Sequence, residues 1–273
     1  MPIDEGYFSA ADGEQLFYRF QTGIQSEKTI LLIHGHGEHS GRYLKFFSRL
    51  KDLGRPIGIF DLRGCGRSGG YSVYVSRFED YINDVSSFLD FLKTKYQVCL
   101  PICLFGHSLG GLIAAAWALE RDGQISKLIL SSPLFGIPMA SAVRLLVKVL
   151  DPLVSRWIIK NPVRAGFLTH DPEEVKRYLA DPLIRRSITV RLAREMLRYT
   201  DFFRKGKVQF PFPVYILMAE KDYIVDPAAT RRFFDRVKAT EKKLEAFPGF
   251  FHEIFNERGQ ERAFERLRYY LCK

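Results

Sequence analysis

A serine in a glycine-flanked turn is the first residue of this sequence that could do chemistry. The stretch GHSLG (residues 106–110) matches G-x-S-x-G, directly after the apolar run LPICLF and directly before LGGLIAAAWALE. Between a strand and a helix, this pattern forms a strained turn, and its glycines remove the Cβ atoms that would collide there. Ser108 is therefore predicted to be a nucleophile.

A serine hydroxyl is a poor nucleophile near neutral pH, so it needs a base and the base needs an orienting carboxylate. With this kind of turn, both partners come later in the chain, each after a strand. Asp222 follows the apolar run PVYILMAEK, and His252 follows KKLEAF within PGFFHE. Both are expected in loops at the sheet edge where Ser108 lies. The sequence thus predicts a triad of Ser108, His252 and Asp222.

Three other residues compete for these roles. Asp226 stands four residues after Asp222, but the proline that follows it is typical of a helix start. His107 neighbours the predicted nucleophile, and we expect its side chain to pack within the scaffold. His170 lies further along the chain, where a surface position is the expectation.

The stretch LLIHGHGEHSGRY (residues 31–43) holds His34, His36 and His39 within six positions, which raises the question of a metal. Glu38 does not complete a convincing ligand set, so we predict no metal. The His-Gly-x-Gly pattern instead predicts that the backbone N–H groups of His36 and Leu109 meet a carbonyl oxygen as it gains negative charge. Each such donor contributes roughly 3–4 kcal/mol to transition-state stabilisation.

The elements that must position these residues alternate between strand and helix. Asp12-Gly13 between two aromatic-rich runs predicts a hairpin. Later strands are predicted at KTILLIHG, RPIGIFDLRG, LPICLFGHS, SKLILSSP, PVYILMAEKD and KKLEAFPG. Helices are predicted over residues 43–53, 78–96, 109–120 and about 227–238, and in a last stretch to Leu271. The predicted class is α/β, with a mostly parallel sheet and helices on both faces.

Residues 134–207 interrupt this alternation after the sixth predicted strand. They contain no convincing strand, and four Asp-Pro or Asn-Pro pairs are typical of helix starts. The pairs are Asp151-Pro152, Asn161-Pro162, Asp171-Pro172 and Asp181-Pro182. We therefore predict a core domain of residues 1–133 and 208–273 and a helical cap of residues 134–207.

Charge is concentrated in the predicted cap. Residues 134–210 hold 15 lysines and arginines against 7 acidic residues, which is +8 of the chain's net +10. A basic segment can contact an anionic lipid surface. We expect peripheral membrane contact there, although a solvated helical surface would have the same composition. No nucleic-acid motif accompanies the charge, so no nucleic-acid partner is predicted.

Apolar residues at the start of the cap predict a slot for an acyl chain, with internal packing of the cap as the alternative. The predicted slot residues are Leu134, Phe135, Ile137, Leu145, Leu146 and Val149.

Composition also bounds the location of the protein. No apolar run reaches the ~18 residues that span a bilayer, and no signal peptide is evident. The four cysteines of the 273 residues are irregularly spaced. We expect reduced thiols in a cytoplasmic protein.

Five motifs together resemble one family. HGHGEHSGRY, DLRGCGRSGG, GHSLGG, the cap's DPL (181–183) and PGFFHE are similar to the monoacylglycerol lipase and lysophospholipase branch of the α/β-hydrolase superfamily, over nearly the whole chain. The resemblance implies the α/β-hydrolase fold, the same triad and amides, and hydrolysis of a single acyl ester without a cofactor. Cys65 stands where the family has histidine, which predicts a structural turn and a thiol sensitive to alkylating reagents.

Other functions use the same residues. A short-chain or aryl carboxylesterase, a thioesterase or an aminopeptidase would combine the triad with a different pocket, and a lysophospholipase would accept a phosphate head group. A non-catalytic lipid-binding relative is the alternative from another class.

Overall fold

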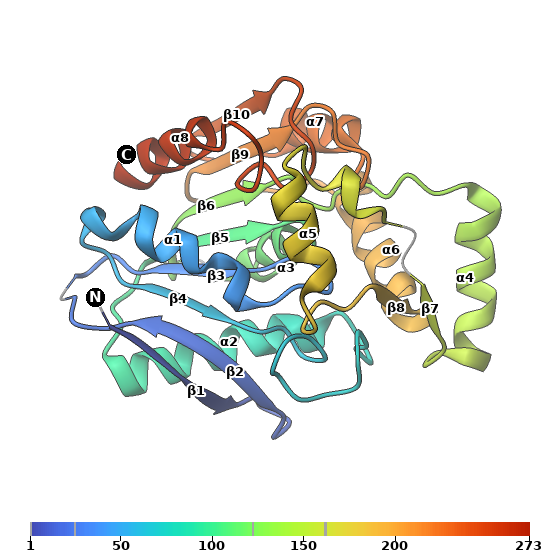
Figure 1. Cartoon of the computed structure of the whole chain (residues 1–273), viewed down its shortest axis with the longest axis horizontal. Helices are drawn as coiled ribbons and strands as arrows, with labels where there is room; N and C mark the ends of the chain where they lie inside the picture. The colour runs from blue at the N-terminus through green and yellow to red at the C-terminus, as the bar shows by residue number, and fades with distance from the viewer. Residues whose placement is uncertain (1, 25, 122, 161–162) are drawn as a thin grey trace.

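A mixed eight-stranded sheet forms the centre of the computed structural model, which describes residues 2–24, 26–121, 123–160 and 163–273 (Figure 1). Within these residues the strand order is β1-β2-β4-β3-β5-β6-β9-β10. The strands are β1 (Ile3–Ser9), β2 (Gln15–Gln21), β3 (Ile30–Ile33), β4 (Ile57–Phe60), β5 (Ile102–His107), β6 (Ile125–Ser131), β9 (Val214–Ala219) and β10 (Lys242–Phe247). All neighbours from β4 to β10 are parallel, which confirms the predicted fold class.

The N-terminal hairpin is present as predicted. β1 and β2 pair antiparallel from Ile3 opposite Gln21 to Ser9 opposite Gln15. Gly13 takes φ +87° in the connecting turn, a left-handed conformation that glycine adopts without strain. β2 then adds antiparallel to β4, so the hairpin extends the parallel sheet at one edge.

Helices cover both faces of the sheet, because the central strands are apolar on both sides. One face packs against α1 (Leu44–Arg49) and α8 (Glu261–Cys272). The other packs against α2 (Glu79–Tyr96), α3 (Leu109–Ala118) and α7 (Pro227–Arg236). Within the described residues, no helix is both long and apolar enough to cross a bilayer.

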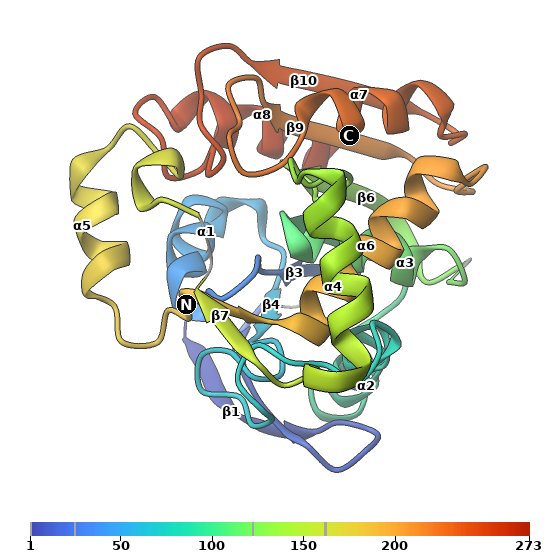
Figure 2. The same ribbon diagram turned by 90° about the vertical axis from the view of Figure 1, so that its right-hand side faces the viewer.

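The insertion between β6 and β9 lies beyond the carboxyl ends of the central strands (Figures 1 and 2). It contains α4 (Ser141–Val154), β7 (Ile158–Lys160), a 3-10 turn (Ala165–Phe167), α5 (Pro172–Ala180), β8 (Ser187–Thr189) and α6 (Val190–Lys205). The prediction that this segment has no strand is wrong, because β7 and β8 pair antiparallel. With three residues each, they are too short to show a periodic pattern.

The proline pairs of the insertion have different roles. Asp171 begins α5 as predicted, since its Oδ1 accepts a hydrogen bond from Glu173 N at 2.9 Å. Pro152 lies inside α4 and Asp181 follows the end of α5, so the prediction of helix starts there is wrong. The Asn-Pro pair at 161–162 falls outside the described residues.

Candidate active site

Ser108 lies in a tight turn between β5 and α3. Its backbone has φ +52° and ψ −117°, a strained conformation for a residue with a side chain. A Cβ on Gly106 would lie 2.3 Å from Gly110 O, and one on Gly110 would lie 2.2 Å from Ile33 O. Only glycine fits at either position, so the strained turn expected from the motif is present.

His252 and Asp222 form a buried hydrogen-bonded pair. The distance from His252 Nδ1 to Asp222 Oδ2 is 2.7 Å, and the side chains are 4% and 1% exposed. The other carboxylate oxygen accepts hydrogen bonds from Ile224 N and Val225 N. Asp226, the competing residue, instead caps α7 through Ala228 N. The carboxylate is thus fixed before any substrate binds.

The pair has a clear electrostatic bias. Burial lowers the pKa of His252, but the charge and hydrogen bond of Asp222 outweigh burial and leave that pKa above its ordinary value. Burial raises the pKa of Asp222, but His252 and the two amide donors outweigh it and leave that pKa lowered. Asp222 therefore stabilises a proton on the imidazole.

Ser108 and His252 line one small cavity of about 50 Å³. Gly35, His36, Leu168 and Ile224 are among its other lining residues. Among the described residues, no hydrogen bond joins Ser108 Oγ to His252. Contacts of this kind are often long without substrate and tighten when it binds.

The loop after β3 passes directly beside Ser108. A Cβ on Gly35 would lie 3.3 Å from Ser108 Cβ. Within the described part of the chain, the amides of His36 and Leu109 donate no hydrogen bond to another residue. His36 lines the cavity, and Leu109 directly follows the lining residue Ser108.

The insertion holds this loop in place. The His36 ring contacts Ser187 O through Nε2 at 2.9 Å, and Arg185 N donates to Gly37 O at 2.7 Å. Gly37 has φ +71°, and a Cβ there would lie 2.2 Å from Arg185 O. The position of the His36 amide therefore depends on the insertion.

The histidines of the stretch 31–43 bind different partners. His34 Nε2 accepts a hydrogen bond from Leu62 N at 2.8 Å, and His39 Nε2 lies 2.9 Å from Asp181 Oδ2. Together with His36, they tie the loop to the core and to the insertion.

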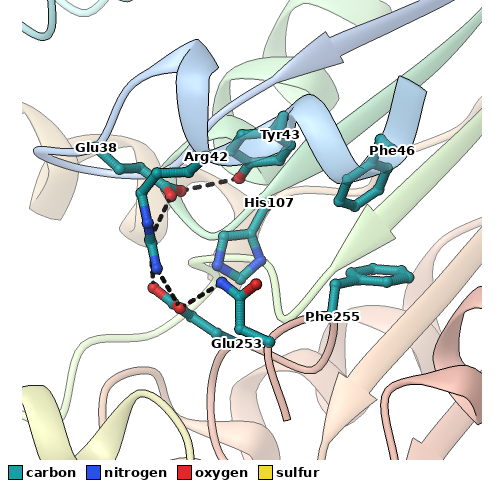
Figure 3. Close-up of a pocket in the computed structure, with 8 residues that line it drawn as sticks. Glu38, Arg42, Tyr43, Phe46, His107, Glu253 and Phe255 are labelled. Carbon is teal, nitrogen blue, oxygen red and sulfur yellow. Dashed lines mark hydrogen bonds and ion pairs between the residues drawn. The ribbon is translucent and has the colours of Figure 1, made fainter. Parts of the chain in front are cut away.

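A buried ionic network in the wall of the cavity is a feature that the sequence did not predict (Figure 3). Arg42 donates to Glu38 once and to Glu253 twice, each at 2.7 Å. Glu38 also accepts from Gly35 N at 2.6 Å and Tyr43 OH at 2.9 Å. The network joins the loop of His36 to the loop of His252. The residues of this network belong to the motifs GEHSGRY and HE, but nothing in the sequence indicates that residues 211 positions apart form an ion pair.

His107 lines the same cavity, and its ring centroid lies 4.9 Å from that of His252. Its side chain is buried, and Nδ1 contacts Ser131 Oγ at 3.1 Å. Burial, followed by the charge of His252, lowers the pKa of His107 to about 4. His107 is therefore neutral at pH 7 and adds no positive charge beside His252. His170, expected at the surface, has a side chain that is 42% exposed.

Cys65 lies in a turn, as expected, between Gly64 and Gly66, which both have positive φ. Its side chain is 2% exposed, and burial raises the pKa of the thiol to about 12. The expected sensitivity to alkylating reagents does not fit this environment, because the thiolate is the reactive form.

The six residues predicted to form an acyl slot are not among the residues that line the cavity at Ser108. Leu134 and Phe135 are buried in the main core, and Ile137 packs against its edge. Leu145, Leu146 and Val149 are 63%, 53% and 59% exposed on α4. The slot stays a prediction, and these three residues give the insertion an apolar outer surface.

Comparisons with known proteins identify the family of the chain. The family model described as serine aminopeptidase, S33, matches residues 24–259. Human monoglyceride lipase is 30% identical over 253 residues, which cover 90% of this chain and 82% of the human protein. Mycolicibacterium smegmatis monoacylglycerol lipase is 28% identical, covering 94% and 92%. The crystal structure of Paleococcus ferrophilus monoacylglycerol lipase, 28% identical, has a TM-score of 0.83 and coverage of 99% and 98%. The chain spans only 47% and 27% of two longer relatives, from Escherichia coli and Dictyostelium discoideum.

Proposed function

The chain belongs to the serine aminopeptidase S33 family and to the monoacylglycerol lipase-like branch of the α/β-hydrolase superfamily, and from this premise we propose that it hydrolyses the carboxylic ester of a monoacyl lipid. Ser108 attacks the ester carbonyl while His252 Nε2 takes its proton. The alcohol leaves with that proton, and an acyl-enzyme forms on Ser108. A water molecule activated by His252 then releases the fatty acid.

The charge that develops in this reaction has fixed partners. The carbonyl oxygen becomes negative and accepts hydrogen bonds from the amides of His36 and Leu109. The imidazole becomes positive beside Asp222, whose contact at Nδ1 leaves Nε2 to face the reacting atoms. The reaction needs no cofactor.

One observation carries the proposal. The His252–Asp222 pair, at 2.7 Å, shares a cavity with a serine on a strained turn. A packing role would not require a serine at φ +52° or a buried imidazole paired with a buried carboxylate, because both are costly to fold.

Entry of a lipid requires the insertion to move. The cavity at Ser108 is about 50 Å³, whereas sites for drug-sized ligands occupy roughly 300–1,000 Å³. Its apolar lining at Leu168 and Ile224 suits an acyl chain. Leu168 and Tyr178 are insertion residues that line the cavity, so we infer that displacement of the segment that carries them opens the remaining volume.

We further propose that α4 contacts a lipid surface. Its exposed apolar side chains continue into the segment that follows the helix: Val143, Leu145, Leu146, Val149, Leu153, Trp157, Ile158 and Ile159. Exposed Lys148, Arg156 and Lys160 flank them, which suits an anionic membrane. Other cap arginines are instead paired, such as Arg191 and Arg194 with buried Asp151.

We propose the cytoplasm as the location, because the four cysteines are free thiols.

An aminopeptidase activity is less well supported by the charges at the cavity. A peptidase of this kind must bind a free ammonium group, for which a carboxylate is the natural partner. Glu38 and Glu253 line the cavity, but both are already paired with Arg42. Carboxylesterase and thioesterase activities stay open, since they differ only in the pocket.

A substrate panel tests the proposal. Monoacylglycerol, lysophosphatidylcholine, a short p-nitrophenyl ester, an acyl thioester and an aminoacyl p-nitroanilide are compared by kcat/KM. We expect the monoacyl lipids to be preferred and Ser108→Ala to lower kcat by about 10⁶-fold. Turnover by that variant at near wild-type rate would refute the triad assignment. Preference for the short ester or the anilide would refute the assignment of a lipid substrate.

Vesicle sedimentation tests the membrane contact. Leu145→Glu with Val149→Glu should release the protein from anionic vesicles, whereas Leu179→Glu, an exposed leucine on α5, should not. Equal binding to neutral and anionic vesicles would remove the electrostatic part of the proposal. Unchanged vesicle binding by the α4 variant would refute the proposal that α4 contacts the membrane.

A further inference from the structure

The loop that carries His252 contains a second buried carboxylate, Glu257, whose side chain is 2% exposed. Its Oε1 accepts a hydrogen bond from Phe251 N at 2.9 Å, directly before His252. The same oxygen accepts from His170 N at 3.2 Å and contacts His170 Nδ1 at 2.7 Å. Its Oε2 accepts from Arg258 N at 3.0 Å. One carboxylate thus makes four contacts, two with its own loop and two with His170 of the insertion.

Two further hydrogen bonds join the insertion to the same loop. Glu253 N donates to Leu168 O at 2.8 Å. Thr169 Oγ1 donates to Asn256 O at 2.7 Å. Residues 168–170 of the insertion are therefore docked along the segment from 251 to 257.

Aromatic rings extend the docking to the loop of Asp222. The His170 ring stacks on Phe251, with centroids 3.6 Å apart and planes at 27°. Tyr223, next to Asp222, has its ring centroid 5.4 Å from that of Phe251 and 4.9 Å from that of Phe167. The insertion thus meets both loops that carry the proposed base and its carboxylate.

We propose that Glu257 is a positioning residue for His252 and that the docked insertion, through His170, completes this role. The inference rests on the proposed function, in which His252 is the base. Glu257 does not line the cavity at Ser108, so it acts only through the main chain of Phe251. A buried carboxylate is a strong acceptor for amide donors, and its loss leaves them unsatisfied.

The consequence for catalysis follows from the distances that proton transfer needs. His252 must bring Nε2 within hydrogen-bond reach of Ser108 Oγ, and a misplacement of 1 Å can cost about 10²-fold in rate. Asp222 fixes the ring from one side, and Glu257 fixes the backbone that carries it. Since His170 shares the same oxygen, undocking the insertion also loosens His252.

Three variants with one control test this role. Glu257→Ala removes the acceptor, Glu257→Gln keeps one acceptor oxygen for Phe251 N, and His170→Phe keeps a stacked ring without Nδ1. Glu245→Gln is the control: its carboxylate lies on β10 before the same loop and binds Arg266 and Tyr270. The readouts are kcat and KM for a short p-nitrophenyl ester, the rate of fluorophosphonate labelling and the fraction of protein that is labelled.

We expect Glu257→Ala to lower kcat by about 10- to 100-fold with KM changed by less than about twofold. The labelling rate should fall in parallel, because it also needs His252 as a base. Glu257→Gln should recover part of the loss, His170→Phe should lose a few-fold in kcat, and Glu245→Gln should match the wild type.

Each contrary outcome is distinct. Wild-type kcat per labelled site in Glu257→Ala would reduce Glu257 to a folding role and overturn the proposal. Should that variant not fold, wild-type kcat in both Glu257→Gln and His170→Phe would overturn it equally. Failure of the proposed function is seen separately, as unchanged activity and labelling in Ser108→Ala.

Discussion

Removing the guanidinium of Arg42 should destabilise the protein strongly and in a pH-dependent way. Arg42, Glu38 and Glu253 are 11%, 7% and 6% exposed and share three hydrogen bonds of 2.7 Å. Arg42→Met keeps the aliphatic stem and leaves two buried carboxylates without their cation. Breaking a buried ion pair on one side costs about 3–5 kcal/mol, so we expect a loss of this size in the free energy of unfolding at pH 7.

The pH dependence follows from the two carboxylates. In the wild type, burial opposes ionisation, but Arg42 and nearby histidines outweigh it and lower the pKa of Glu38 to about 2. The pKa of Glu253 is also lowered, chiefly by Arg42 against burial. Both groups therefore stay ionised at pH 5. Without Arg42, both carboxylates lose the interaction that most lowers their pKa, while burial continues to raise it. Both pKa values should therefore rise, so the folded variant takes up protons between pH 7 and 5 and its deficit in unfolding free energy shrinks.

Urea unfolding followed by the fluorescence of buried Trp117 measures this difference at both pH values. Arg42→Lys is the matched control, because it keeps the charge but cannot make the paired contact to Glu253. A deficit below about 1 kcal/mol at pH 7, the range of an exposed pair, would refute the reasoning. A deficit that does not shrink at pH 5 would also refute it.

Three further predictions concern the site. Gly37→Ala should lower kcat by about 10²- to 10³-fold, because a Cβ 2.2 Å from Arg185 O displaces the loop that carries the His36 amide; wild-type kcat would contradict this. The acid limb of the pH profile of kcat/KM should have its midpoint above about pH 6.5, because His252 acts as the neutral base and Asp222 raises its pKa. Asp222→Asn should move this midpoint to lower pH. A wild-type midpoint at or below about 6.5 would count against the role of the His252–Asp222 pair. Iodoacetamide at pH 7 should modify Cys65 far more slowly than the exposed cysteines, as measured by peptide mass; equal rates would disprove its burial.

Much of the fold was predictable because its signals are local. Apolar runs such as residues 30–33 and 102–107 are buried on both sides, and a strand in a covered parallel sheet has this pattern. The insertion was harder. The Asp151-Pro152 pair predicts a helix start, but Pro152 lies inside α4, and Asp151 pairs with Arg191 and Arg194 of α6 instead of capping a helix. Tertiary contacts overrode the local signal there.

The predicted site divides in the same way. Ser108 has a motif with flanking elements, and His252 and Asp222 follow from strand order. The roles of Arg42 and Glu257 depend on contacts between distant segments, which composition and spacing do not encode. The apolar residues Leu145 and Val149 predict a slot, which stays a prediction. Both are exposed on α4, and periodicity alone does not tell whether a helix face meets protein or lipid.

The most direct measurement is the site and stoichiometry of fluorophosphonate modification, determined by intact mass and peptide mapping. One adduct per chain on Ser108, abolished in Ser108→Ala and strongly slowed in His252→Ala, is the result we predict. Modification at another residue, or an unchanged rate on Ser108 without His252, would contradict the central claim that this serine is activated by that histidine.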